Sequence, residues 1–222
     1  MDSTPTPRAL LLDLDGTIAD TIPLIFEAFR HAVAPWVDRP PTDAEIEATF
    51  GPPERGCLAL MVPAAALDEA EEEFHQYYEP RVADRVAIFE GMAGVIDHAR
   101  SMGWRVGVFT GKGRRSAEFT LARLGLRDRV EHLVSGDDVV RPKPDPEGVR
   151  RAAEALGVAV GRVLLAGDSP VDVVAGRAAG SRTAAVLWAA FRPDRLRQAG
   201  ADFTCDRVDD LKAAINTLDA GG

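Results

Sequence analysis

Two carboxylates directly follow an apolar run near the start of the chain. Residues 9–12 read Ala-Leu-Leu-Leu, Asp13 comes next, and Asp15 precedes Gly16. Such a run is typical of a buried strand in a parallel sheet. Residues two apart along a strand share a face, so both carboxylates should face one site where the strand opens into a loop. A calcium loop is excluded because its twelfth position, which needs Glu, is Leu24.

Three further segments carry polar groups suited to phosphoryl chemistry. Apolar runs at 106–109 and 163–167 resemble the first strand, and 141–146 is a loop that holds a lysine between prolines. The carboxyl edge of a parallel sheet is where open α/β folds bind ligands. The polar residues of these segments are Thr110, Gly111, Lys112, Lys143, Asp168 and Asp172.

The residue types at this edge can be assigned chemical roles. A carboxylate can attack phosphorus, so Asp13 is the candidate nucleophile. Asp15 is suited to protonate the leaving oxygen and then to activate water. Thr110 and the amide of Gly111 can donate to phosphate oxygens, and Lys143 supplies a positive charge to the transferring phosphoryl group. These roles together describe hydrolysis in two steps through an aspartyl phosphate.

The acidic residues also predict a magnesium site. Asp13 and Asp168 offer hard oxygen ligands without sulfur or imidazole, which favours Mg²⁺ over zinc. Without a cation, these carboxylates would repel a phosphate dianion. Asp172 is better placed to orient a metal-bound water or Lys143 than to bind the metal itself. It could also be only an acidic residue in the first turn of a helix.

The four segments, in this order over residues 9–187, resemble the motifs of the haloacid dehalogenase-like hydrolase superfamily. The Asp-Leu-Asp-Gly-Thr form resembles the phosphatase branch, close to phosphoglycolate phosphatases and pyrophosphatases. The resemblance implies a three-layer, Rossmann-like α/β core with a parallel sheet and an inserted all-helical cap. It also implies that the backbone carbonyl of Asp15 joins Asp13 and Asp168 in holding Mg²⁺. The activity it implies is a magnesium-dependent phosphatase acting on a small phosphomonoester such as phosphoglycolate, or on pyrophosphate.

The spacing of apolar residues predicts two kinds of region. Residues 18–82 have only helical spacing, with helical stretches over 18–36, 54–61 and 67–82, and with a capping box at Thr42 and Glu45. From Gly91 onward helices and strands alternate, which predicts a parallel sheet covered on both faces. We therefore expect a core domain of residues 1–17 and 88–222 and a cap domain of residues 18–87. The elements expected in the core are helices 92–102, 114–125, 145–156, 170–179, 193–199 and 208–218 and strands 104–109, 131–135, 162–167 and 182–187.

Two basic residues are candidates for substrate specificity. Arg55 lies in the cap loop 51–56 and could clamp a carboxylate or a second phosphate. It could equally be a surface arginine at the start of a helix. Lys112 lies beside Thr110 and could meet a second anionic group of the substrate, or it could belong to the solvated first turn of a helix.

Three other functions use some of the same residues. A haloacid dehalogenase also has an aspartate nucleophile and needs no magnesium, but in that family the second acid is absent, whereas Asp15 is present here. A phosphosugar mutase of the β-phosphoglucomutase kind would share the core and differ in the cap. A binding protein with an inactive core is disfavoured because Asp13 and Lys143 are both present.

Composition limits the partners and the compartment. The 222 residues carry a net charge of −9, which disfavours nucleic acid and anionic membranes as partners. The chain has only two cysteines, too few for a disulfide framework. We therefore expect a protein of the reducing cytoplasm. The polar residues 1–7 do not resemble a secretory signal. We expect a small phosphorylated metabolite as the partner and a monomer or homodimer, and we interpret the four scattered histidines as structural.

Overall fold

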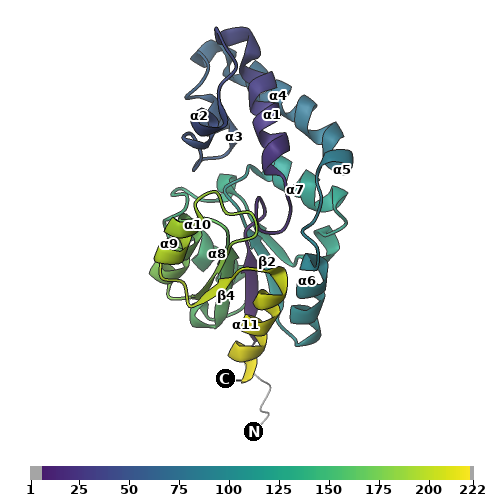
Figure 1. Cartoon of the computed structure of the whole chain (residues 1–222), viewed down its shortest axis with the longest axis vertical. Coiled ribbons are helices and arrows are strands. Elements are labelled where there is room, and N and C mark those ends of the chain that lie inside the picture. Colours follow the sequence, from purple (N-terminus) through teal and green to yellow (C-terminus); the bar gives the residue numbers. More distant parts are fainter. Residues whose placement is uncertain (1–6, 221–222) are drawn as a thin grey trace.

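Six parallel strands form the centre of the fold in this computed structural model, which describes residues 7–220 (Figure 1). Their order is β3-β2-β1-β4-β5-β6, so β1 lies between β2 and β4. Leu10 of β1 pairs with Val106 of β2 on one side and with Leu164 of β4 on the other. The strands are β1 (Ala9–Leu12), β2 (Arg105–Phe109), β3 (His132–Val134), β4 (Val163–Gly167), β5 (Arg182–Val186) and β6 (Phe203–Cys205).

Helices cover both faces of the sheet, which confirms the predicted three-layer α/β core. Leu10 and Leu12 of β1 belong to the apolar cluster beneath α6, α7 and α11. Ala9 and Leu11 point the other way, into a second cluster with α8. This alternation follows from the two-residue repeat of a strand. The helices of the core are α6 (Met92–Ser101), α7 (Arg114–Arg123), α8 (Glu147–Ala155), α9 (Pro170–Ala179), α10 (Pro193–Gln198) and α11 (Val208–Ala220).

The segment between β1 and α6 contains helices and short 3₁₀ turns, and lies above the carboxyl end of the sheet in Figure 1. Its two long helices pack together, with the rings of Phe29 and Phe74 4.9 Å apart. The chain enters and leaves this segment side by side, because Asp20 N donates to Ala87 O and Phe89 N donates to Ile18 O. Its helices are α1 (Ile22–Val33), α2 (Asp43–Glu47), α3 (Glu54–Leu58), α4 (Leu67–Tyr78) and α5 (Val82–Arg85). We call residues 18–87 the cap; that it forms a separate domain stays a prediction.

Most predicted elements have counterparts, and their limits differ by a few residues. The capping box at Thr42 and Glu45 is present. The helix predicted over 67–82 is interrupted by a 3₁₀ turn at Glu79–Arg81, where Pro80 lacks the amide hydrogen that a continuous helix needs. Strand β6 was not predicted. No helix within residues 7–220 has the length and apolar character needed to cross a bilayer. The prediction that residues 1–7 do not form a secretory signal falls largely outside the described residues.

Candidate active site

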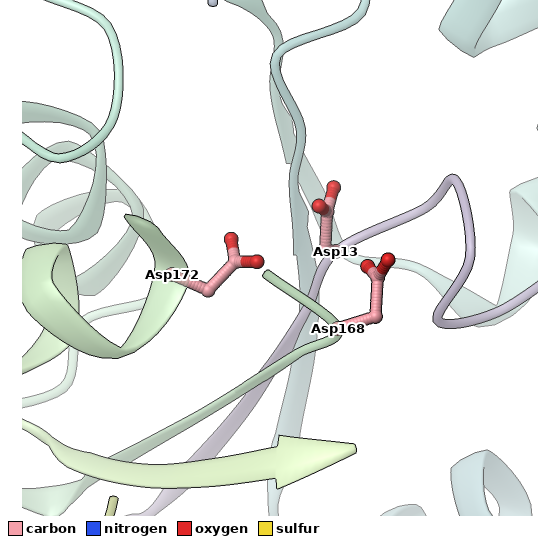
Figure 2. Close-up of side chains that lie close together, drawn as sticks. All are labelled: Asp13, Asp168 and Asp172. Atoms are coloured by element: carbon pink, nitrogen blue, oxygen red, sulfur yellow. The ribbon is translucent and has the colours of Figure 1, made fainter. Parts of the chain in front are cut away.

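Three carboxylates meet at the carboxyl ends of β1 and β4. Asp13 directly follows β1, Asp168 directly follows β4, and Asp172 lies in the first turn of α9. One oxygen from each lies within 4.8 Å of the others. In Figure 2 the carboxylates of Asp13 and Asp168 point the same way, and that of Asp172 turns toward them. Neighbouring parallel strands thus bring together acids that are about 155 residues apart in sequence.

Lys143 provides the positive charge beside this carboxylate cluster. Its ammonium lies 3.2 Å from Asp13 Oδ2 and 2.6 Å from Asp172 Oδ1, and it donates to the backbone oxygen of Phe109 at 2.8 Å. The side chain is only 6% exposed. Asp172 also accepts from the backbone amide of Ser169. One oxygen of Asp172 thus pairs with Lys143 and the other accepts from Ser169, contacts that suit a residue orienting Lys143; that role stays a prediction.

The cluster carries more negative charge than one lysine balances. Burial raises the pKa of the Asp13 carboxyl to about 7; Asp172 and Asp15 add to the rise and Lys143 opposes it. Burial, together with Asp13 and Asp172, raises the pKa of Asp168 well above its ordinary value. A hard divalent cation would offset this repulsion and keep the acids ionised. The donor set, all carboxylate oxygen, therefore fits Mg²⁺.

The loop after β1 holds Asp168 in one orientation. Gly16 has a φ of 76°, and a Cβ added there would lie 2.4 Å from Asp168 Oδ2. Only glycine allows both this backbone conformation and this close approach. The hydroxyl of Thr17 donates to Asp168 Oδ1 at 3.0 Å. Sequence reasoning did not single out Thr17, although it closes the Asp-Leu-Asp-Gly-Thr motif.

Asp15 is held by a second buried lysine. Lys112 Nζ lies 3.3 Å from Asp15 Oδ1 and 3.8 Å from Glu54 Oε1 of the cap. The hydroxyl of Thr21 donates to Asp15 at 2.6 Å, and the ring of Tyr78 lies 4.6 Å from the ammonium. Burial alone would lower the pKa of Lys112, but Asp15, Tyr78 and Glu54 raise it above its ordinary value. Lys112 therefore stays charged and lies between the cap and the acid that we expect to move protons.

Glu54 connects the cap to the core and was not singled out from sequence. It is 7% exposed, and its Oε2 accepts from the backbone amide of Gly113 at 2.7 Å, just before α7. The sequence offered little signal for this contact, because it depends on the placement of the cap over a loop 59 residues away.

The predicted substrate-binding residues fall into two groups. Thr110, Gly111, Lys112 and Lys143 line one cleft with Asp13, Asp15 and Asp168. Arg55 instead lines a smaller hollow between the cap and the start of α7. Its guanidinium, nearly half exposed, pairs with Asp68 at 2.7 Å and with Glu71. A role of Arg55 in substrate binding stays a prediction, and its contacts here are within the cap.

The large cleft has a volume of about 560 Å³. The cap forms one wall, and the carboxyl end of the sheet forms the floor. A strand-end carboxylate, a second acid, two lysines and a cluster of carboxylate oxygens in one cleft are typical of α/β enzymes that transfer phosphoryl groups.

Comparison with known proteins gives the family. Residues 10–186 match the model of the haloacid dehalogenase-like hydrolase family, and the chain belongs to that family. It is 34% identical over 214 residues to a plasmid-encoded phosphoglycolate phosphatase of Cupriavidus necator, covering 93% of this chain and 92% of that protein. It is 28% identical to a putative pyrophosphatase of Clostridium perfringens, covering 96% and 99%. A crystal structure of a predicted phosphoglycolate phosphatase from Haemophilus somnus superposes with a TM-score of 0.82 at 15% identity, covering 96% and 99%. The chain is thus a hydrolase with phosphatases among its relatives, as the motifs implied.

Proposed function

We propose that this protein is a magnesium-dependent phosphatase that hydrolyses a small phosphorylated metabolite through an aspartyl phosphate on Asp13. The observation that carries the proposal is the meeting of Asp13, Lys143 and Asp168 from three separate segments in one cleft. Each of these groups has a separate task in phosphoryl transfer, and a structural role explains none of them well because burying the charges is costly. Phosphoglycolate and pyrophosphate are the substrates that the sequence resemblance suggests.

The first step forms the covalent intermediate. A carboxylate oxygen of Asp13 attacks phosphorus, and the bond from phosphorus to the leaving oxygen breaks. Lys143 lies 3.2 Å from Asp13, where it can compensate charge on the equatorial phosphoryl oxygens. Thr110 and the amide of Gly111, at the end of β2, are placed to donate to the same oxygens.

Asp15 moves the proton in both steps. In the first it gives a proton to the leaving oxygen, so the alcohol departs neutral. In the second it takes a proton from the water that attacks the phosphorus of the aspartyl phosphate, and Asp13 is released as carboxylate. The hydrogen bond from Thr21 and the contact with Lys112 hold the Asp15 side chain in place for both transfers.

Asp13, Asp168 and the backbone carbonyl of Asp15 would hold the magnesium ion. When bound, the ion supplies positive charge that lets a phosphate dianion approach the carboxylates. Thr17 and Gly16 keep Asp168 directed to that place.

The test is phosphate release from a panel of phosphomonoesters and pyrophosphate, with Mg²⁺ and with excess chelator. We expect release with Mg²⁺, none with chelator, and none from Asp13→Asn. Asp84→Asn, which makes the same change at an exposed position of the cap, is the matched control and should keep full activity. Halide release from a 2-haloacid in chelator would contradict the proposal and favour a dehalogenase. Transfer of phosphate between sugar positions without release would favour a mutase.

A further inference from the structure

Most of the cleft beyond the catalytic residues is apolar. Its volume of about 560 Å³ falls within the usual range for sites that hold drug-sized ligands, about 300–1,000 Å³. The phosphoryl group needs only the end beside Asp13 and Lys143. A two-carbon acid or a second phosphate would leave the remaining space to water, against apolar walls.

Two aromatic rings belong to the exposed part of these walls. Phe50 of the cap is 38% exposed and Phe191, in the loop after β5, is 46% exposed. We call these two residues the aromatic wall. Both lie with ring centroids 6.0 Å from Phe26, which is buried behind them. The cap and the core thus each contribute one ring, and Phe26 supports both.

Exposed large hydrophobic side chains are concentrated at the cleft. Six large hydrophobic residues are exposed within residues 7–220, and three of them, Phe50, Val171 and Phe191, line the cleft. Exposed apolar surface gathered inside a concave site is typical of a ligand-binding surface.

The charged groups of the cleft do not favour a second anion close to the phosphoryl site. Lys112 is engaged by Asp15 and Glu54, and Lys143 by Asp13 and Asp172. Arg192 pairs with Glu47 of the cap at 2.9 Å. Arg195 of α10 also lines the cleft, and no described residue forms an ion pair with it.

We propose, on the basis of the phosphatase function above, that the substrate is a phosphomonoester of an alcohol with a flat apolar or aromatic face, which packs against Phe50 and Phe191. Burying a ring of the ligand against this wall removes apolar surface of both partners from water, and offset or edge-to-face ring contacts add to the attraction. The alcohol part, rather than a second anion, then determines specificity.

The test compares 2-phenylethyl phosphate with ethyl phosphate. Both release a primary alcohol, so the chemistry at phosphorus is matched and only the apolar face differs. We expect kcat/KM to be higher for 2-phenylethyl phosphate by about tenfold or more. We also expect its Kd for the inactive Asp13→Asn variant, measured by calorimetry, to be lower by a similar factor, which assigns the preference to binding.

Substitutions of the aromatic wall test whether Phe50 and Phe191 cause the preference for 2-phenylethyl phosphate. Phe50→Ala and Phe191→Ala should each reduce the ratio of the two kcat/KM values. Leu60→Ala removes a large apolar side chain that is 71% exposed on the cap and lies outside the cleft, so it should leave the ratio unchanged. If the ratio stays at its wild-type value in both phenylalanine variants, the aromatic wall does not cause the preference.

The remaining outcomes separate this inference from the function it rests on. Equal kcat/KM for the two esters, or a preference for phosphoglycolate or pyrophosphate over 2-phenylethyl phosphate, would overturn the inference and leave the phosphatase activity standing. Arg195 would then be the cation to test. Release of phosphate from none of these compounds in the presence of Mg²⁺ would overturn both.

Discussion

Replacing Lys112 with methionine should uncouple the cap from the catalytic acid. The ammonium of Lys112 lies between Asp15 of the core and Glu54 of the cap, and the side chain is 2% exposed. Methionine has a similar length and no charge, so the change removes the ion pairs without leaving a large cavity. Both carboxylates would then be left without their cation.

The two ion-pair distances of Lys112 give the size of the attraction that Lys112→Met removes. At an effective dielectric constant of about 20, the Coulomb attraction between Lys112 and Asp15 at 3.3 Å is about 5 kcal/mol. The attraction between Lys112 and Glu54 at 3.8 Å is about 4 kcal/mol. The cost of dehydrating the charges offsets part of this attraction. Breaking a buried pair from one side typically costs about 3–5 kcal/mol. For a protein of this size a loss of about 3 kcal/mol lowers Tm by about 6–12 °C.

A double-mutant cycle tests the coupling directly. Urea denaturation would be measured for Lys112→Met, for Glu54→Gln and for the double variant. Glutamine keeps an oxygen that can accept from the Gly113 amide, so that hydrogen bond is retained. We expect the double variant to be more stable than the sum of the two changes predicts, by about 1–3 kcal/mol. Additive effects within about 0.5 kcal/mol would refute the link through Lys112.

Three other changes have defined outcomes. Asp15→Asn should slow hydrolysis of alkyl phosphates more than that of p-nitrophenyl phosphate, because a good leaving group needs little protonation; an equal loss on both would argue against the acid role. Arg55→Ala should have little effect on stability, since Arg55 is about half exposed and paired within the cap; a large rise in KM for phosphoglycolate would assign Arg55 to the substrate site, and an unchanged KM would leave it a surface arginine of the cap. Burial, with help from Arg115, lowers the pKa of His75 below its ordinary 6.5. The unfolded chain therefore takes up this proton more readily, and stability should decrease as the pH falls below about 6.5; His75→Gln should show a smaller decrease over this range than the wild type in denaturation measured at each pH.

The core of the site could be predicted from sequence because its residues directly follow strands. Asp13, Thr110 and Asp168 each come after an apolar run, and parallel strands end at the same edge of a sheet. The meeting of Asp13 and Asp168 follows from that rule, and Asp172 joins them from the first turn of α9. Strand β6 escaped prediction because it has only three residues, lies at the edge of the sheet and pairs on one side.

The contacts between cap and core could not be predicted. The sequence singled out Arg55 as a candidate for substrate binding and left Glu54 unmentioned, although Glu54 is the residue that bonds to the core. Successive residues of a helix point about 100° apart, so a small difference in helix orientation decides which of them faces the cleft. Phe50 and Phe191 come together through Phe26, although they are 141 positions apart. No pattern within a short stretch of sequence predicts a contact between residues so far apart.

The most direct measurement of the central claim is detection of the covalent intermediate. The enzyme would be mixed with Mg²⁺ and substrate, quenched in acid and treated with borohydride, which reduces an acyl phosphate to the alcohol. Mass spectrometry of the peptide that contains position 13 should then show homoserine in place of Asp13, and no such product without substrate. An enzyme that turns over substrate under these conditions while Asp13 stays unmodified, or an Asp13→Asn variant that keeps its activity, would contradict the account.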